Sequence, residues 1–383
     1  MGVRFISGGE SHGSRLVCIL EGLPAGLKVS SDFINAELKR RQGGYGRGGR
    51  MKIESDRVEF LSGIRFGETI GSPITLSVEN RDWKNWQEKM SSEGLPVGEK
   101  VTNARPGHAD LTGAAKYNRS DVRDILERSS ARETTMRVAA GALCKIFLKA
   151  CGVEISGEVL SVGGVSGEVE IKNRIDEAKN LGDTVGGIFE VKISGVPAGL
   201  GSHIQWDKKL DAKFAAAFMS IQAIKAVELG DGFSNATKLG SEVHDEIFIG
   251  TRNEEQGTSS LTSTSSQFLI PTSYKIFRNT NRAGGFEGGM TNGEDLIIRA
   301  AMKPIPTLMK PLRTVDIATK LATTASKERS DTCAIWAAQV VGEAMAAIVL
   351  ADAFVEKFGG DALTDTLANL KNYRERLARD FGL

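Results

Sequence analysis

Two segments, ERSSARETTMRVAAGALCKIFLKA at 127–150 and ERSDTCAIWAAQVVGEAMAAIVLADAF at 328–354, decide the expected fold. Each opens on the same Glu-Arg-Ser tripeptide and continues with apolar residues at helical spacing. The second is apolar around much of its circumference, interrupted mainly by Glu343 and small residues. A helix of this kind is buried. We therefore expect an α+β fold, in which a helical core is sandwiched between antiparallel β-sheets, rather than a succession of βαβ units.

The starts of the two helices carry local signals. Ser130 is expected to act as an N-cap, and Glu133 to complete a capping box. Free backbone N–H groups and the helix dipole then favour an anion beside Arg128, Ser129 and Ser130, so these residues predict a phosphate or flavin pocket. On local grounds, Asp331 at the second helix is a plain N-cap.

A further echo follows two β-rich runs. The hexapeptide GLPAGL comes after the run at 15–21, and GVPAGL, 173 residues later, comes after the run at 188–194. A helical pattern follows each hexapeptide, over about 31–41 and 207–229. The Glu-Arg-Ser tripeptides lie 201 residues apart, in the same order along the chain.

These echoes favour an internal duplication within a single domain over 1–383, with similar halves of about 1–180 and 181–383. Chance matching of short peptides in a glycine-rich chain is the alternative.

Composition restricts the classes of function. The 383 residues are 40% hydrophobic and 25% charged, enough for a sizeable core, and the net charge is +1. An anion site must therefore be a local concentration of cations. The four cysteines are scattered without metal-ligand spacing, so we expect no metal site and no disulfide framework. No signal peptide and no uncharged apolar run of membrane-spanning length is present, which predicts a cytoplasmic protein.

The densest positive segment is KRRQGGYGRGGRMK at 39–52. Its six cations and absence of acids predict an anion-binding loop, with a solvated loop or an RNA-binding segment as alternatives. The G-x-G-x-x-G pattern at 44–49 follows a helix instead of a strand, which excludes a dinucleotide fingerprint.

Two of the four histidines occupy glycine-containing turns. His12 lies in GESHG at 9–13, and His108 lies in RPGHAD at 105–110. A lone histidine is usually structural, but positions in turns favour a functional role over packing on an apolar face. Ser11 and His12 do not form a nucleophilic dyad, because adjacent side chains on extended backbone point apart.

Six segments together resemble the chorismate synthase family, in collinear order along most of the chain. They are GESHGSRLVCILEGLP (9–24), RRQGGYGRGGRM (40–51), RPGHADLTGAAKY (105–117), ERSSARETTMRVAAGAL (127–143), KPIPTLMKPL (303–312) and RSDTCAIWAAQVVGEAM (329–345). Thr332 departs from the family pattern, in which proline is more frequent after Arg-Ser-Asp.

The resemblance implies a lyase of aromatic amino acid biosynthesis that converts 5-enolpyruvylshikimate 3-phosphate into chorismate and phosphate by anti-1,4-elimination. The family requires reduced FMN without net redox change and usually forms homotetramers. NADPH as an indirect electron source, and an external flavin reductase, remain open. No nucleic acid and no membrane partner is implied. The alternatives are an RNA-binding protein that uses 39–52 and a flavin oxidoreductase with net electron consumption.

The resemblance also implies residue roles. Catalytic roles fall on His108 beside the flavin, on His12 at the phosphate end of the substrate, and on Asp331, which helps to remove the proton. Arg41 and Arg47 match positions that bind the phosphate of the substrate or of NADP. The FMN-contacting positions are matched by Arg128, Ser129, Ser130, Gln222, Ala223, Gly288, Lys303, Pro304, Ile305, Pro306, Thr307 and Arg329.

Overall fold

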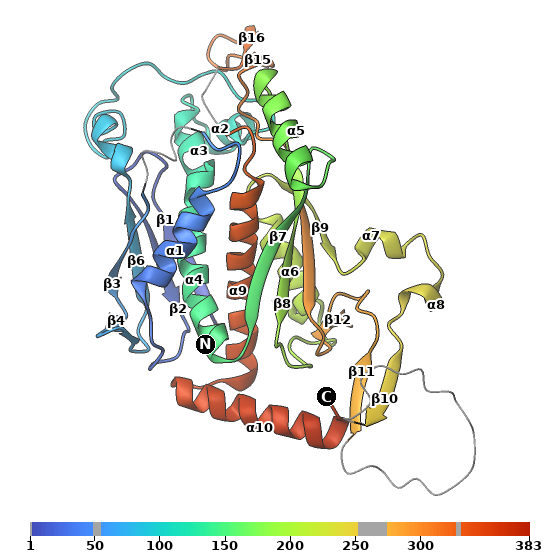
Figure 1. Cartoon of the computed structure of the whole chain (residues 1–383). Coiled ribbons are helices and arrows are strands. Elements are labelled where there is room, and N and C mark those ends of the chain that lie inside the picture. The colour runs from blue at the N-terminus through green and yellow to red at the C-terminus, as the bar shows by residue number, and fades with distance from the viewer. Residues whose placement is uncertain (1, 49–54, 252–273, 327–330) are drawn as a thin grey trace, which may run out of the picture.

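Three helices from distant parts of the chain stand between two antiparallel sheets (Figure 1). They are α1 (Ser31–Gln42), α4 (Thr134–Ala150) and α9 (Ile335–Phe358). The structure is a computed structural model that describes residues 2–48, 55–251, 274–326 and 331–383. The α+β sandwich expected from the two long apolar helices is confirmed.

Each sheet has four strands in antiparallel order. The first sheet is β1 (Arg4–Gly8), β2 (Arg15–Glu21), β6 (Ile74–Glu79) and β3 (Val58–Ser62), in that spatial order. The second is β7 (Glu154–Val162), β8 (Gly187–Ser194), β14 (Leu296–Met302) and β9 (Ile224–Leu229). Along β2 the buried residues Leu16, Cys18 and Leu20 alternate with more exposed ones, as expected for a sheet with one face on the core.

Shorter elements extend from this sandwich. The hairpins are β4 (Ile64–Arg65) with β5 (Glu68–Thr69), β10 (Ile247–Thr251) with β11 (Tyr274–Arg278), β12 (Phe286–Glu287) with β13 (Met290–Thr291), and β15 (Arg313–Val315) with β16 (Ala322–Thr324). The other helices are α2 (Asp110–Tyr117), α3 (Arg123–Ser129), α5 (Glu168–Asn180), α6 (Leu210–Met219), α7 (Gly232–Asn235), α8 (Gly240–Val243) and α10 (Leu363–Phe381). Three short 3₁₀ segments are η2 (Arg81–Asn85), η3 (Ala131–Glu133) and η4 (Trp206–Lys208).

The two central helices approach closely at Gly141 of α4. A Cβ placed on Gly141 would lie 2.5 Å from the Cβ and 2.6 Å from the Cα and carbonyl oxygen of Ala344 in α9. Backbone atoms cannot move aside as a flexible side chain can, so only glycine permits this approach.

We expect Gly141→Ala to destabilise the protein by about 1–3 kcal/mol. Alanine normally stabilises a helix by about 1 kcal/mol relative to glycine, so a net loss would come from the steric conflict with Ala344. The free energy of unfolding in urea measures this change. The matched control is Gly240→Ala in α8, where the nearest atom, in the His244 ring, lies 3.7 Å from the added Cβ. Equal effects of the two substitutions would contradict the prediction.

Glu343, the acid within the apolar α9, belongs to a buried charge cluster. The Lys145 ammonium lies 2.5 Å from carboxylate oxygens of both Glu343 and Glu37, and the Arg40 guanidinium donates to both acids. Neutralised in this way, a carboxylate can lie in the core. Arg40, part of the basic segment at 39–52, is therefore a structural residue.

The helix expected over 207–229 is wrong. Helix α6 ends at Met219, and Ile224–Leu229 form the edge strand β9, paired with β14. Between them Ala223 has φ +67°, a left-handed conformation that ends helical geometry. Pairing with β14 across the sheet decides the state of this segment against its helical pattern.

The two sheets match strand for strand, since β1-β2-β6-β3 and β7-β8-β14-β9 have the same order along the chain and in space. The loops after β2 and β8 are also closed identically. The hydroxyl of Thr69 donates to the Pro24 carbonyl and accepts from the Leu27 N–H, while Thr291 bonds in the same way to Pro197 and Leu200. We propose that the chain consists of two similar halves, which join near residue 152, between α4 and β7.

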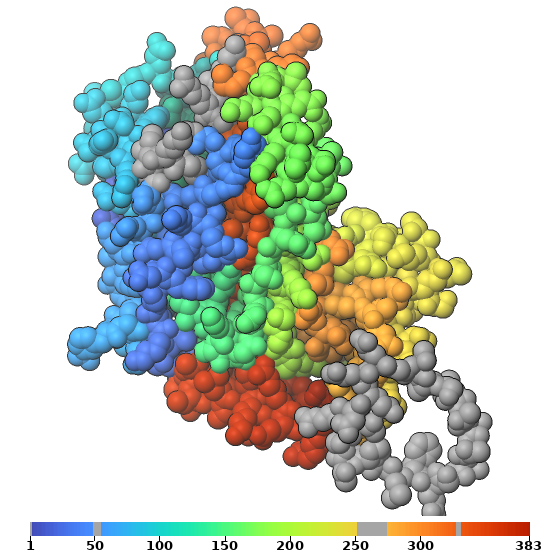
Figure 2. Space-filling model, viewed as in Figure 1, coloured from blue at the N-terminus to red at the C-terminus, as the bar shows by residue number. Residues whose placement is uncertain are grey.

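Helix α9 is long and apolar enough to cross a membrane by length and composition. In this fold 89% of its most apolar window is buried inside the protein. The apolar surface is covered by α4, α1, α6 and strands β7 and β8 of the second sheet, and only part of the helix is visible in Figure 2.

Candidate active site

The elements that carry most of the residues singled out in the sequence meet at one end of the sandwich, the upper end in Figure 1. The turn between β1 and β2 carries His12, and the loop before α2 carries His108. The segment after β14 and the approach to α9 contribute from the second half of the chain. Helix α10 lies across the opposite end.

His12 is held on two sides. Its Nδ1 lies 2.9 Å from Oε1 of Glu127, and its backbone N–H donates to Oε2 of the same carboxylate at 2.8 Å. The ring also lies against Trp86, with centroids 4.1 Å apart. Arg123 contacts the Glu127 carboxylate at 3.2 Å. The imidazole is therefore oriented while 18% of the side chain stays exposed.

His108 has a similar environment. Its Nδ1 contacts Oδ1 of Asp110, whose Oδ2 accepts a hydrogen bond of 2.8 Å from Nε of Arg105. The Asp110 side chain is 1% exposed and the His108 side chain 15%. Both histidines thus meet a buried carboxylate that is also bound by an arginine.

The pKa values of these two carboxylates predict acid sensitivity. Burial alone raises the pKa of Asp110, but hydrogen bonds from His108 and Arg105 outweigh it and hold the pKa below the ordinary 3.8. Burial and His12 act in the same way on Glu127, whose pKa lies below 4.5. A carboxylate with a lowered pKa stabilises the fold above its unfolded-state pKa and loses this contribution as pH falls towards the folded-state pKa.

We therefore expect the free energy of unfolding to fall as pH decreases below about 4.5, and Asp110→Asn to flatten part of this decline. Urea unfolding at a series of pH values measures the slope. Asp124→Asn, a change at an exposed acid paired with Arg119, is the control and should leave the slope as it is. An unchanged slope in Asp110→Asn would contradict the prediction.

Glu133 connects predicted flavin-contacting residues. Its carboxylate accepts from Nε2 of Gln222 at 2.9 Å and from Nε of Arg137 at 3.0 Å, and lies 3.9 Å from the Arg128 guanidinium. Arg128 donates in addition to the carbonyls of Ser7 and Gly9. Arg128 and Gln222, from different halves of the chain, are thereby brought together. The capping box expected for Glu133 is wrong, since its side chain faces these partners.

The two serines that follow Arg128 serve the local backbone. Ser130 caps the 3₁₀ segment η3 by accepting from the N–H of Arg132, so the N-cap expected at Ser130 holds for that segment and not for α4 itself. The Ser129 hydroxyl donates to the Ile125 carbonyl.

The segment after β14 lies beside the His108 loop. Lys303 donates its backbone N–H to the Ala223 carbonyl at 2.9 Å and its Nζ to the Gly107 carbonyl at 2.8 Å. Burial, with a smaller contribution from Lys225, lowers the pKa of Lys303. Directly after Lys303 come the predicted flavin-contacting residues Pro304, Ile305, Pro306 and Thr307. Of these, Thr307 is buried. The Ile305 carbonyl accepts from the Thr184 hydroxyl.

The two arginines expected to bind phosphate, Arg41 and Arg47, have acidic partners. Arg41 is 3% exposed, lies 3.0 Å from Asp56 and donates to the Thr134 hydroxyl. Burial lowers the pKa of Arg41 to about 10 against the opposing effect of Asp56. Arg47 lies 2.8 Å from Asp331, which also accepts from the Gly48 N–H at 2.6 Å.

Asp331 is not an N-cap, because α9 begins four residues later at Ile335. Its carboxylate instead joins the approach to α9 with the glycine-rich loop. The backbone N–H of Thr332 adds a bond to the Gly46 carbonyl, so the departure from proline at this position supplies a donor.

One predicted residue, Gly288, stands apart from this cluster. Gly288 lies in the turn of the β12–β13 hairpin, beside the start of α6, whereas Gln222 lies beyond the end of α6. Helix α6 has ten residues, about 15 Å in length. Arg329 lies outside the described residues.

The sequence reasoning gave no site role to the acids Glu127, Asp110, Glu133 and Asp56. Three of them stand inside quoted motifs: Glu127 directly before Arg128, Glu133 in the same segment, and Asp110 at the end of RPGHAD. Proximity to a candidate histidine or arginine was therefore the available signal. Their partners lie up to 126 residues away in the sequence, as for Glu133 and Ser7, and 115 residues away for Glu127 and His12.

In chemical terms this end of the molecule combines buried cations, two oriented imidazoles and one accessible carboxylate, Asp331, whose side chain is 21% exposed. Such a set suits a substrate with several negative charges from which a proton is removed. Within the described ranges, no group of three or more His, Cys, Asp or Glu side chains could hold a metal ion.

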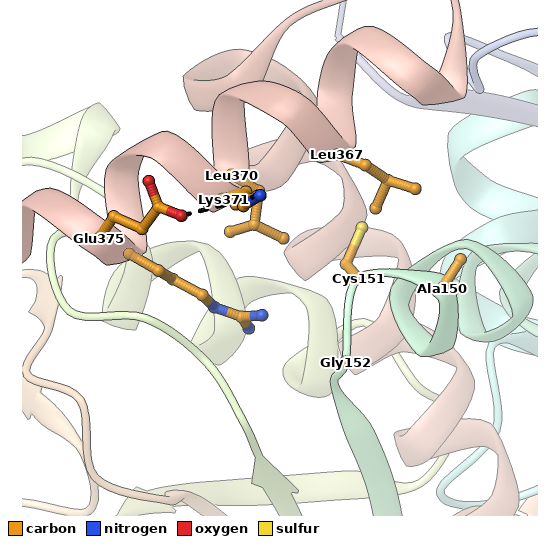
Figure 3. Close-up of a pocket in the computed structure, with 8 residues that line it drawn as sticks. Ala150, Cys151, Gly152, Leu367, Leu370, Lys371 and Glu375 are labelled. Carbon is orange, nitrogen blue, oxygen red and sulfur yellow. Dashed lines mark ion pairs between the residues drawn. The ribbon is translucent and has the colours of Figure 1, made fainter.

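A surface hollow of about 330 Å³ lies elsewhere, between the end of α4 and helix α10 (Figure 3). Leu367 and Leu370 form part of its wall, with Lys371 and Glu375 paired at its edge. Burial raises the pKa of the adjoining Cys151 thiol to about 11, which keeps the thiol unreactive. This hollow shares no residue with the cluster described above.

Known proteins resemble this chain over nearly its full length. A family model described as chorismate synthase matches residues 3–355. The chorismate synthase of Geobacter metallireducens is 52% identical over 403 aligned residues, which cover 98% of this chain and 99% of the relative. That of Thermoanaerobacter pseudethanolicus is 53% identical over 371 residues, covering 97% and 98%. A crystal structure of chorismate synthase has a TM-score of 0.75 and 39% identity, covering 100% of this chain and 99% of the other.

Proposed function

The chain belongs to the chorismate synthase family and forms chorismate, and from this premise we propose that it does so with reduced FMN at the cluster around His12, His108 and Asp331. The lyase reaction converts 5-enolpyruvylshikimate 3-phosphate into chorismate and phosphate in the shikimate pathway. One ring C–H bond and the C–O bond to phosphate break, and a new C=C bond forms. The proposal is carried by one observation: the β1–β2 turn, the loop before α2 and the approach to α9, which contain these three residues, lie at the same end of the sandwich (Figure 1).

The buried polar atoms near Glu133 show whether the residues of this site suit FMN. Oε1 of Gln222 is buried and has no hydrogen-bond partner among the described residues, while its Nε2 is committed to Glu133. A flavin ring carries N–H groups that such an acceptor can bind, and its phosphate suits cations such as Arg128. The residues therefore fit the group.

The FMN-binding set under this proposal is Arg128, Ser129, Ser130, Gln222, Ala223, Gly288, Lys303, Pro304, Ile305, Pro306, Thr307 and Arg329. Bound reduced FMN supplies electron density to the substrate ring, with no net redox change. The remaining work falls on the side chains of the chain itself.

His12 donates a hydrogen bond or a proton to the departing phosphate, and Arg47 provides positive charge that stabilises it. Arg41, which is buried against Asp56, contributes to the phosphate site only through the field of its charge. His108, on the side of Lys303, stabilises negative charge on the flavin. Asp331 helps to remove the ring proton. For this Arg47 exchanges its contact with Asp331 for a phosphate group, so that the carboxylate becomes available as the substrate enters.

The RNA-binding alternative loses its physical basis. Of the basic segment, Arg40 and Arg41 are engaged with buried acids, so they do not form a free cationic stripe. Membership of the chorismate synthase family favours a lyase over an oxidoreductase with net electron consumption.

Anaerobic turnover of 5-enolpyruvylshikimate 3-phosphate with photoreduced FMN tests the proposal. Equimolar chorismate and phosphate, with many turnovers for each reduced flavin, are expected. Stoichiometric oxidation of the flavin would instead indicate net electron consumption. Omission of NADPH and of any reductase tests whether either is needed once FMN is reduced. We expect neither to be needed, with an external reductase supplying reduced flavin in the cytoplasm.

We also infer a homotetramer. The separation of Gly288 from Gln222, about the length of α6, supports an arrangement in which a neighbouring copy supplies Gly288 to the same FMN. Sedimentation velocity with and without FMN measures the assembly. If the protein becomes monomeric on dilution and still binds FMN as tightly as before, this inference is contradicted.

A further inference from the structure

Each candidate catalytic histidine is bound by a buried carboxylate that has no assigned role. We propose that Glu127 and Asp110 are positioning residues, each of which holds the Nδ1 of one histidine and leaves Nε2 as the ring atom presented to ligands. The inference rests on the proposed function, because it takes His12 and His108 as the groups that act.

The geometry at His12 is specific. Glu127 binds both the ring Nδ1, at 2.9 Å, and the backbone N–H of the same residue, at 2.8 Å. A single carboxylate thereby sets the position of the main chain and the rotation of the ring. Trp86 covers one ring face, so the ring has little freedom left. The Glu127 side chain is 2% exposed, which excludes water as a competing partner.

Asp110 repeats this arrangement at His108 within a shorter loop. Its Oδ1 contacts the ring Nδ1, and its Oδ2 accepts from both the backbone N–H and the Nε of Arg105. The Arg105 guanidinium also lies 3.1 Å from Nδ1 and 3.4 Å from Nε2 of His108, so at this histidine Nε2 has a neighbouring donor that a ligand must share or displace. The two histidines are thus the ends of two Arg–carboxylate–His series, one with Arg123 and one with Arg105.

The chemistry of a carboxylate determines the tautomer. An ionised carboxylate only accepts hydrogen bonds, so the ring nitrogen that faces it must carry the hydrogen. Hydrogen bonds from the histidine itself, with a further contribution from Arg123 or Arg105, outweigh burial and keep Glu127 and Asp110 ionised. Nε2 is then the ring atom left to accept a proton when the ring is neutral, or to donate one when it is charged.

Double-mutant cycles test whether the acids act through the histidines. Glu127→Gln and Asp110→Asn are each expected to lower kcat about tenfold to a hundredfold, with KM changed less. Added to His12→Ala, Glu127→Gln should cause no further loss, because its target is gone. Asp110→Asn should likewise cause no further loss in His108→Ala.

The crossed pairs are the matched controls. Glu127→Gln with His108→Ala, and Asp110→Asn with His12→Ala, should show the product of their separate effects, since each acid then still has its own histidine. Multiplicative losses in the cognate pairs would overturn the inference and leave the acids as structural residues. Wild-type turnover in both His12→Ala and His108→Ala would instead overturn the proposed function, because the histidines would then have no part in the reaction.

Nitrogen NMR of the ligand-free protein, labelled in its four histidines, supplies a readout independent of turnover. The Nδ1–H form is expected for His12 and His108. Glu127→Gln should change the ring nitrogen shifts of His12 and leave those of His108, and Asp110→Asn should do the reverse. Unchanged shifts at the cognate histidine in either variant would overturn its positioning role.

Discussion

His108→Ala is expected to lower kcat for chorismate formation about a thousandfold, while the melting temperature stays within a few degrees of wild type. A positioned acid or base contributes about 10²–10⁴-fold to a rate. His108 lies in a loop, with its ring partly exposed, and the neighbouring Gly107 accepts a hydrogen bond from Lys303. Its removal leaves Asp110 bound to Arg105, so no buried charge is left without a partner. The fold should therefore survive.

Steady-state kinetics with reduced FMN, together with thermal unfolding, measure this result. His244→Ala removes an exposed histidine in the distant α8 region and serves as the control, with unchanged kcat expected. His108→Gln, which keeps a polar side chain at the position, guards against loss of folding. Retention of more than a tenth of the wild-type kcat in a folded His108→Ala protein would contradict the assignment.

Asp331→Asn is expected to lower kcat about a hundredfold or more, with FMN affinity changed less than tenfold. Asparagine retains an acceptor oxygen for the Gly48 N–H, so the contact between the glycine-rich loop and the approach to α9 can persist. The substitution removes the negative charge that faces Arg47 and the ability to take a proton. The loss should therefore appear in turnover and not in cofactor binding.

Flavin titration and single-turnover kinetics separate these two quantities. Asp245→Asn is the control, because Asp245 also accepts hydrogen bonds from the backbone, at Arg282 and Ala283, in a region away from the cluster. Parallel losses of FMN affinity and kcat in Asp331→Asn would indicate a role in building the pocket rather than in proton removal.

Local patterns in the sequence predicted the sandwich fold and several residues of the candidate active site. The apolar circumference of 335–358 could be read without a structure, because a helix with no polar face has to be covered. The turns around His12 and His108 were visible for a similar reason, since glycine and proline mark them. In each case the information lay within a few residues of the feature.

Features that depend on distant partners could not be read in this way. Residues 224–229 form a strand because β14 pairs with them, 70 residues further along, at Leu229 and Ile298 among others. The acids that hold the histidines belong to the same class, as do Glu133 and the ion pair of Arg41. A buried carboxylate looks the same in sequence as an exposed one until its partner is known.

The apolar covering of α9 also constrains how the protein is made. The ribosome completes α4 by residue 150, but α9 extends to residue 358, and at about 5–20 residues per second this leaves a delay of roughly 10–40 s. During that time the surface of α4 around Gly141 has no partner, and α9 emerges as a segment that resembles a membrane anchor. Chaperone binding to nascent chains is therefore expected to be strongest in this interval and to end when the last central helix inserts.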